Sequence, residues 1–243
     1  MSSDQPRYKR VVLKISGEGF CPAGGFGVHR DPLDRIADEI ISITQLGTQI
    51  AIVVGGGNFL RGSRFADELG IDRATADYMG MLGTVLNALA LQEALEHRNQ
   101  HTRVQSALAI ARVGEPFDRH RCLRHLEKGR AVVLAAGTGN PHVTTDSCAS
   151  IRAVELRADA LLKGTKVDGI FDSDPATNPA AKRYQNVSYE QVINNRLRVM
   201  DIGAAEMCEQ YQVPVIVFNL FKPGTLRRVV LGDPIGTRMG PAE

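Results

Sequence analysis

The chain has 243 residues, 43% of them hydrophobic, and its 29 Lys and Arg residues exceed its 27 Asp and Glu residues by two. This length and apolar content suit one α/β domain over residues 1–243, with enough core to fold independently. A net charge of +2 argues against bulk binding to nucleic acid or membranes, which shows as a strong basic excess, so we expect neither as a partner.

Short apolar runs and helical patterns alternate in the first part of the chain. Residues 11–16 (VVLKIS) form the first predicted strand. The apolar spacing that follows predicts a helix with Asp31 as its N-cap, Pro32 at its first position and Gly47 as its stop. A second strand is predicted over residues 49–54 (QIAIVV).

The same alternation continues toward the middle of the chain. A long helical pattern covers roughly residues 72–97 and a weaker strand pattern covers residues 103–110. A helix is then predicted over residues 118–128 and a strand over residues 131–136.

The last part of the chain contains the longest predicted loop. A helix over about residues 145–156 and a weak strand over residues 158–163 come before it. The loop, residues 166–184, is rich in Asp, Asn and Pro, and loops of that length are usually functional or mobile. A helix over residues 201–211 and a strand over residues 213–220 follow.

This order of elements predicts the fold class. Continuous apolar strands are typical of sheets that are buried on both faces. We therefore expect a doubly wound α/β fold, in which a mainly parallel open sheet has helices on both faces. Ligands of such sheets bind at the carboxyl ends of the strands, where loops meet helix N-termini.

Three glycine-bearing loops each follow a predicted strand, at residues 14–20, 55–62 and 137–146. Glycine lets backbone N–H groups approach an anion closely, and a following helix dipole favours negative charge there. One such loop is more often a tight turn, but three at one sheet edge favour phosphate binding. Lys14 and Arg61 place cationic groups beside these loops. Neither a Walker motif nor a G-x-G-x-x-G motif occurs.

A set of longer motifs identifies a resemblance. They occur in order between about Tyr8 and Thr237: LKISGE, GGGNFLRG, ATADYMGMLGTVLNALALQEAL, AAGTGNPHVTTD, LLKGTKVDGIFDSDP and VMD. The chain resembles the bacterial uridylate (UMP) kinases of the amino-acid-kinase superfamily. The resemblance implies transfer of the γ-phosphoryl group of ATP to UMP in pyrimidine nucleotide biosynthesis, with Mg²⁺ entering alongside ATP. It also implies a homohexamer that GTP activates and UTP inhibits.

The resemblance assigns site residues by matching motif positions. The catalytic residues that it implies are Lys14, Arg61, Asp146 and Asp201. The ATP-binding residues that it implies are Lys14, Ile15, Ser16, Gly17, Gly57, Arg61, Thr165, Phe171 and Asp174. The UMP-binding residues that it implies are Gly56, Asp77, Thr138, Gly139, Asn140, Pro141, His142, Val143, Thr144 and Thr145.

Simpler structural roles stay open for several of these residues. Asp77 could be an ordinary acid in the first helical turn, and Thr145 and Asp201 could be plain N-caps. No general base is required, because a UMP phosphate oxygen is already ionised at neutral pH. Asp146 and Asp201 would instead orient Lys14 and help to place Mg²⁺, whose ligands the sequence does not identify. Lys163, at a predicted strand end, is a further candidate cation near the γ-phosphate.

The sequence departs from the family pattern at two places. His142 and Val143 replace two aromatic residues of the acceptor loop, which leaves base selectivity open. Gly24, Gly25, Arg103 and Arg130 match the family's regulatory positions. Three other positions of that regulatory site carry different residues here: Gln92, Glu96 and Arg119. The response to GTP is therefore not predicted in sign or strength.

Cysteine usage and the N-terminus suggest a cytoplasmic protein. The four cysteines form no C-x-x-C pair, so reduced thiols are expected rather than a zinc or disulfide framework. The first ten residues lack the apolar core of a signal peptide, and no apolar stretch reaches the ~20 residues that span a bilayer.

Two other functions remain open at this point. One is phosphorylation of a carboxylate or carbamate on the same fold, although the helix from Asp72 and the acceptor loop suit a nucleotide better. The other is a nucleotide-binding regulatory protein without turnover. Retention of Lys14, Arg61, Asp146 and Asp201 argues against this second alternative.

Overall fold

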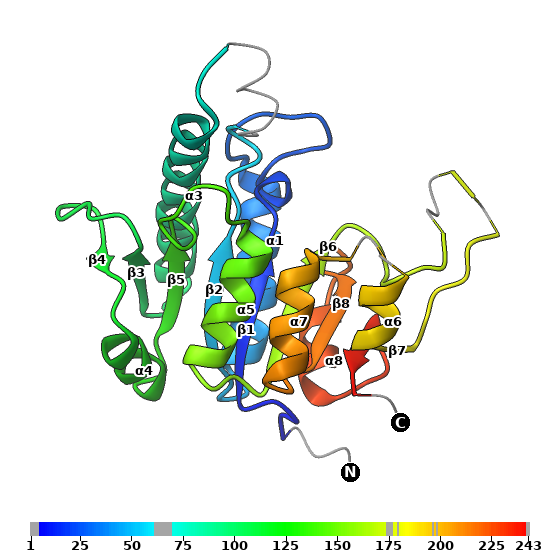
Figure 1. Cartoon of the computed structure of the whole chain (residues 1–243). Coiled ribbons are helices and arrows are strands. Elements are labelled where there is room, and N and C mark those ends of the chain that lie inside the picture. The colour runs from blue at the N-terminus through cyan, green and yellow to red at the C-terminus, as the bar shows by residue number, and fades with distance from the viewer. Residues whose placement is uncertain are drawn as a thin grey trace.

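The structure is a computed structural model that describes residues 5–60, 70–173, 177–178, 180–195, 197 and 199–241. Within these residues, nine strands form one sheet in the order β4-β3-β5-β2-β1-β6-β8-β9-β7 (Figure 1). The strands are β1 (Arg10–Ile15), β2 (Gln49–Val54), β3 (Thr102–Ser106), β4 (Glu115–Pro116), β5 (Ala131–Ala135), β6 (Ala160–Thr165), β7 (Asn186–Ser188), β8 (Val215–Asn219) and β9 (Thr237–Gly240).

The sheet is mainly parallel, as the sequence predicted. Every pairing from β4 to β8 is parallel, whereas β9 runs antiparallel to β8. The central pairing sets Lys14 on β1 opposite Lys163 on β6. Because the residues are paired in register, their side chains leave the same face of the sheet at its carboxyl edge.

Helices cover both faces of the sheet (Figure 1). The helices are α1 (Arg30–Thr44), α3 (Arg73–Glu96), α4 (Arg119–Glu127), α5 (Thr145–Glu155), α6 (Tyr189–Asn194), α7 (Ile202–Gln210) and α8 (Thr225–Leu231), with a 3-10 turn η1 (Gly17–Phe20). Helices α1, α3 and α8 pack in one apolar core against one face of the sheet. Helices α4 to α7 pack in a second core against the other face. The doubly wound arrangement is therefore confirmed.

The start of α1 corrects one prediction. The helix begins at Arg30 with His29 as its N-cap, so Asp31 lies inside the first turn rather than capping it. Pro32 tolerates this shift, because the first four N–H groups of a helix have no intrahelical partner and proline lacks only that group. At the other end, α1 stops at Thr44 and Gly47 takes the left-handed conformation with φ of 81°.

The weaker strand predictions differ from the structure at their ends. A strand was predicted over residues 103–110, but the observed strand β3 spans only Thr102–Ser106. It stops because the Ser106 hydroxyl accepts a hydrogen bond from Leu108 N at 3.2 Å, which turns the backbone. The strand predicted over residues 158–163 runs instead from Ala160 to Thr165. The described residues of the 166–184 loop contain one isolated bridge, between Phe171 and Arg183.

Candidate active site

The three glycine loops meet at the carboxyl edge of adjacent strands. They follow β1, β2 and β5, which are neighbours in the sheet. The first two loops touch, because a Cβ placed on Gly17 would lie 2.5 Å from Gly57 N. Gly56 in turn packs on α3, where a Cβ would lie 2.4 Å from Gly80 O. Only glycine permits these approaches, so the loop after β2 is fitted closely between β1 and α3.

A carboxylate between two lysines lies beside these loops. Asp146 is in the first turn of α5, whose N-terminus favours negative charge. Its Oδ1 lies 2.9 Å from Lys14 Nζ and its Oδ2 lies 2.6 Å from Lys163 Nζ. Lys163 also donates a hydrogen bond to the carbonyl of Val199. All three charged side chains are at most 15% exposed, so water screens their charges weakly.

The pKa shifts in this group follow from burial and charge. Burial acts to raise the pKa of Asp146, but the two ammonium groups outweigh it and hold that pKa below its ordinary value. Burial lowers the pKa of Lys163, and the charge of Asp146 opposes that change. Asp146 is therefore ionised at neutral pH, and it holds Lys14 and Lys163 together at one point of the sheet edge.

Asp201 joins this group through hydroxyl groups. It occupies the N-cap position of α7, but its side chain makes no capping hydrogen bond. Its Oδ2 instead accepts hydrogen bonds from the hydroxyls of Thr144 and, at 3.4 Å, Ser147. The simple N-cap reading of Asp201 is therefore incomplete, because the carboxylate faces α5 rather than the start of its own helix.

The N-cap of α5 is one residue earlier than the sequence suggested. The Thr144 hydroxyl accepts hydrogen bonds from the backbone N–H groups of Asp146 and Ser147, both at 3.2 Å. Thr145 is the first residue of the helix and is therefore not its N-cap. The two adjacent threonines are equivalent as sequence signals, and the contact of Thr144 with Asp201 distinguishes them.

Helix α3 holds the loop that follows β5. Asp77 Oδ2 accepts a hydrogen bond from His142 N at 2.9 Å, and Asp77 Oδ1 pairs with Arg73. Burial acts to raise the Asp77 pKa, but the bond from His142 and the Arg73 charge together keep it below its ordinary value. About two turns further along α3, the Thr84 hydroxyl accepts a hydrogen bond from Ala136 N at 2.6 Å.

A cavity of about 210 Å³ lies between α3 and this loop. It is lined by Arg73, Asp77, Gly80, Met81, Thr84, Gly137, Thr138, His142, Val143, Thr144 and Thr145. The structure thus brings six of the ten residues predicted to bind UMP to one cavity. Its wall combines a carboxylate, hydroxyl groups and exposed backbone, which suits a ligand that carries hydroxyls and an anionic group.

Four residues of the predicted UMP set lie outside that lining. Gly139, with φ of 80°, packs against Ala107, where a Cβ would lie 3.3 Å from Ala107 O. Asn140 is exposed, and its N–H donates to the Thr138 hydroxyl at 3.3 Å. Pro141 follows in the same turn, and Gly56 is buried against α3. His142 takes a positive φ of 64°, which aims its N–H at Asp77.

The predicted ATP side lies next to β1 and β6. Ile15 is buried, whereas Ser16 is half-buried at the start of η1. Thr165 ends β6, and its hydroxyl accepts a hydrogen bond from Val167 N and donates one to Phe218 O. Phe171 lies farther along the 166–184 loop, held by its bridge to Arg183. Arg61 and Asp174 fall outside the described residues.

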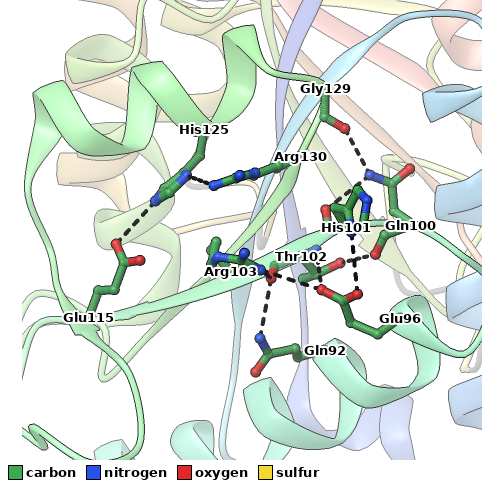
Figure 2. Close-up of polar contacts among 10 residues, drawn as sticks. All are labelled: Gln92, Glu96, Gln100, His101, Thr102, Arg103, Glu115, His125, Gly129 and Arg130. Carbon is green, nitrogen blue, oxygen red and sulfur yellow. Dashed lines mark hydrogen bonds and ion pairs between the residues drawn. The ribbon is translucent and has the colours of Figure 1, made fainter.

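The positions matched to regulation fall in two places. Gly24 and Gly25 are exposed in the loop between η1 and α1. Arg103 and Arg130 belong to a polar cluster near the end of α3 (Figure 2). The cluster consists of Gln92, Glu96, Gln100, His101, Thr102, Arg103, Glu115, His125, Gly129 and Arg130. Arg103 lies 3.5 Å from Glu96, and Arg130 lies 3.1 Å from His125 Nδ1. Both arginines therefore already have partners within the chain.

This cluster borders a second pocket of about 450 Å³. Its charged lining residues are Arg103, Arg112 and Glu115. Glu115 Oε2 also contacts His125 Nε2 at 3.1 Å (Figure 2). The same oxygen accepts a hydrogen bond from Gln105 Nε2 at 3.2 Å. Gln92, another position that departs from the family, donates to Thr102 O and lines the same pocket. Arg119 lies apart at the start of α4, where it donates to Glu155 O.

Sequence reasoning missed several polar residues of the site. Thr84 lies within a run that reads as apolar, and Ser147 reads as an ordinary residue of the first turn of α5. A polar residue in the buried stripe of an apolar helix was the available signal for Thr84, because buried polar groups are almost always bonded. Nothing local distinguishes Ser147, whose partner Asp201 is 54 residues away.

The fold and the site define a class of protein: α/β proteins that bind anionic ligands at the carboxyl edge of a parallel sheet. The model of the amino acid kinase family matches residues 9–219. The chain therefore belongs to the amino acid kinase family.

Several solved structures resemble the chain over nearly its whole length. A UMP kinase from Bacillus anthracis is 40% identical, with a TM-score of 0.94 and 97% of each chain covered. A UMP kinase from Ureaplasma parvum is 36% identical, with a TM-score of 0.89, covering 96% of this chain and 99% of that one. A uridylate kinase from Archaeoglobus fulgidus is 26% identical, with a TM-score of 0.71, covering 95% and 99%.

The described residues contain neither a cluster of metal ligands nor a membrane-spanning helix. Within those residues, no group of three or more His, Cys, Asp or Glu side chains is arranged to hold a metal ion. None of the helices in the same residues is both long and apolar enough to cross a bilayer.

Proposed function

We propose that this chain is a UMP kinase that transfers the γ-phosphoryl group of ATP to UMP, giving UDP and ADP in pyrimidine nucleotide biosynthesis. The observation that carries the proposal is the Lys14–Asp146–Lys163 group, which lies beside the glycine loops and next to the cavity under α3. Catalysis of phosphoryl transfer consists mostly of positioning and charge stabilisation. A site of this kind therefore needs cations and backbone N–H groups close to the phosphates more than it needs a general acid or base.

On the donor side, we assign the ATP phosphates to the loops after β1 and β2. Lys14 and Lys163 supply positive charge, and Asp146 keeps both ammonium groups at the site when no nucleotide is bound. Gly17 and Gly57 bring backbone N–H groups close to the phosphates. Arg61 is assigned to the same phosphates by the resemblance alone.

On the acceptor side, we assign UMP to the 210 Å³ cavity. Asp77 accepts hydrogen bonds from the ribose hydroxyls, which suits a carboxylate that stays ionised. The hydroxyls of Thr138 and Thr145 face the remaining polar atoms of the nucleotide, whereas Thr144 lines the cavity with its hydroxyl engaged by Asp201 and the start of α5. Val143 supplies an apolar contact at a position where the UMP kinases that the sequence resembles have an aromatic residue.

Mg²⁺ enters this proposal with ATP. Mg²⁺ keeps several waters and is usually held by substrate phosphates with one or two carboxylates, rather than by a protein cage. The described residues fit that mode, since Asp146 and Asp201 supply carboxylates beside Ser147 without a wider cluster. When bound, the ion neutralises charge on the phosphates.

The experiment that tests these assignments is steady-state kinetics on Asp77→Asn and Lys14→Ala. Asp77→Asn should raise KM for UMP about tenfold while KM for ATP stays within about threefold, because one acceptor of the ribose contacts is lost. Lys14→Ala should lower kcat by roughly 10²-fold or more. Equal effects of Asp77→Asn on both substrates would refute the acceptor assignment.

We extend the proposal to regulation, with GTP as activator and UTP as inhibitor. UTP carries the uridine and phosphates that the acceptor cavity is assigned to recognise, so competition at that cavity accounts for inhibition. Support for a GTP site comes from Arg103 at the rim of the 450 Å³ pocket. Because Glu96 offsets the charge of Arg103 at 3.5 Å, we expect the GTP response to strengthen in Glu96→Gln.

We also propose a homohexamer in the cytoplasm. Support for self-association comes from Tyr78, Leu82 and Leu86, which form an exposed apolar stripe on α3 and are 43%, 51% and 51% exposed. Contiguous apolar side chains that are exposed on one face of a helix are typical of an interface with another protein chain. Support for the cytoplasm comes from the four cysteines, all buried and unpaired, as is usual in a reducing compartment.

A further inference from the structure

Two buried asparagines hold the loop after β2 against α3. Asn58, in that loop, is 3% exposed, and Asn87, in the middle of α3, is fully buried. Asn58 Nδ2 donates to Asn87 Oδ1 at 2.9 Å, and Asn87 Nδ2 donates to Asn58 Oδ1 at 2.7 Å. The two side-chain amides therefore form a reciprocal hydrogen-bonded pair.

The remaining amide protons reach the backbone of two loops. Asn87 Nδ2 donates to Gly55 O at 2.7 Å, at the start of the glycine loop after β2. Asn58 Nδ2 donates to Gly27 O at 2.8 Å, and Asn58 O accepts from Gly27 N at 3.0 Å. Because both backbone partners are acceptors, each amide nitrogen must face its carbonyl, and every donor of the pair is used.

The same face of α3 also holds the acceptor loop. Asp77 and Thr84 bind the backbone N–H groups of His142 and Ala136. Asp77, Thr84 and Asn87 are seven and three residues apart, so they lie on one side of the helix. One rigid helix thus carries tethers to both the loop after β2 and the loop after β5.

We propose that Asn87, acting through Asn58 and Gly55, is a positioning residue that sets the distance between the donor and acceptor phosphates. The inference rests on the proposed function, in which the loop after β2 contacts phosphates and the loop after β5 holds UMP. Transfer in line is sensitive to small displacements, and a shift of about 1 Å can cost roughly 10²-fold in rate. A buried amide pair fixes the loop in one place, because any displacement leaves polar groups unpaired.

The test is the double variant Asn58→Leu/Asn87→Leu, compared with Thr84→Val. Replacing both amides with branched apolar side chains removes the tethers to Gly27 and Gly55 without leaving an orphaned partner side chain. We expect kcat to fall at least tenfold, with the Kd for UMP, measured calorimetrically, within about threefold of wild type. Thr84→Val, which frees the acceptor loop instead, should raise the Kd for UMP about fivefold or more with a smaller loss of kcat.

Thermal melting separates this role from a purely structural one. A double variant that melts cooperatively above the assay temperature and keeps wild-type kcat overturns the inference, however far its melting temperature has shifted. So does a loss of UMP affinity equal to that of Thr84→Val. If the double variant does not melt cooperatively, Asn87→Ser, whose small side chain leaves room for water, is measured under the same criteria. Absence of UMP-dependent turnover in the wild type would instead refute the proposed function.

Discussion

At the residue scale, the carboxylate of Asp146 lies between two ammonium groups, 2.9 Å from Lys14 Nζ and 2.6 Å from Lys163 Nζ. The lysines are paired across β1 and β6, so their side chains would repel each other without it. A single buried carboxylate therefore makes it possible to place two positive charges where phosphates are to bind. The sequence pointed to Lys14, to Asp146 and, as a further candidate cation, to Lys163, and the strand register shows that the two lysines lie opposite each other.

Asp146→Asn tests this charge balance in activity. The amide keeps the shape of the side chain but no longer attracts either ammonium group. We expect kcat to fall by roughly 10²- to 10³-fold, as when a positioned electrostatic group is removed from an active site. A variant within about threefold of wild type would show that the lysines need no common counterion.

The same substitution has a predicted pH dependence in stability. Because the folded pKa of Asp146 lies below its ordinary value of 3.8, its ionisation stabilises the folded state fully at neutral pH. That contribution is lost as pH falls through the folded pKa. The melting temperature of wild type minus that of Asp146→Asn should therefore be constant from about pH 5 to 7 and shrink below about pH 4. A difference that grows on acidification would contradict the ion-pair account.

At the scale of elements, the interiors of the helices and strands were easier to predict than their ends. The helix from Asp72 was correct at its start, because Asp72 caps α3 through Ala74 N and Thr75 N, a purely local contact. The N-cap of α5 was placed one residue late, since a contact with Asp201 distinguishes Thr144 from Thr145. The short elements β4, β7, β9, α6 and α8 were missed because two to seven residues carry too little periodicity.

The candidate site shows the same division. Asp77 and the threonines of the acceptor loop could be predicted because each lies within one of the two contiguous motifs that carry the resemblance, and the structure brings them to one cavity. The amide pair of Asn58 and Asn87 could not, because its members are 29 residues apart and neither has a local partner. Contacts of that kind appear only when the helix packs on the sheet.

The contact between α1 and α8 leads to a second prediction about how stability depends on pH. Glu39 of α1 is 8% exposed and accepts hydrogen bonds from Gly224 N and, at 2.9 Å, Leu226 N at the start of α8. Burial raises the pKa of Glu39 above its ordinary value of 4.5. Ionisation therefore costs stability, and this cost develops as pH rises through the folded pKa.

Glu39→Gln removes that titration while keeping one acceptor oxygen. The melting temperature of Glu39→Gln minus that of wild type should rise between pH 4 and pH 7, whatever its sign at pH 4. Differential scanning calorimetry at several pH values measures this difference directly. A flat or falling difference would show that the carboxylate is not destabilised by burial.

At the scale of the whole molecule, α3 serves two surfaces. One face carries the tethers of Asp77, Thr84 and Asn87, and the opposite face carries the exposed stripe of Tyr78, Leu82 and Leu86. If copies of the chain pack through this stripe, the cavity of each protomer lies one helix away from a neighbour. Assembly and catalysis are then coupled through a single helix.

Leu82→Glu/Leu86→Glu tests the interface. Charges buried in an apolar interface are strongly unfavourable, so light scattering should show a species smaller than the wild-type assembly, which we propose to be a hexamer of 26.4 kDa chains. Tyr211→Glu at the end of α7, which is 54% exposed, is the matched control and should leave the mass unchanged. An unchanged mass in the double variant would place the interface elsewhere.

The measurement that tests the central claim most directly is ADP formation from Mg-ATP by the purified chain. UMP, CMP, dUMP, AMP and GMP are compared as acceptors, each with and without GTP. The account predicts turnover mainly with UMP, because Asp77 and the threonines of the acceptor loop line one cavity. No ADP with any nucleotide, despite tight ATP binding, would contradict the account and favour a nucleotide-binding protein without turnover.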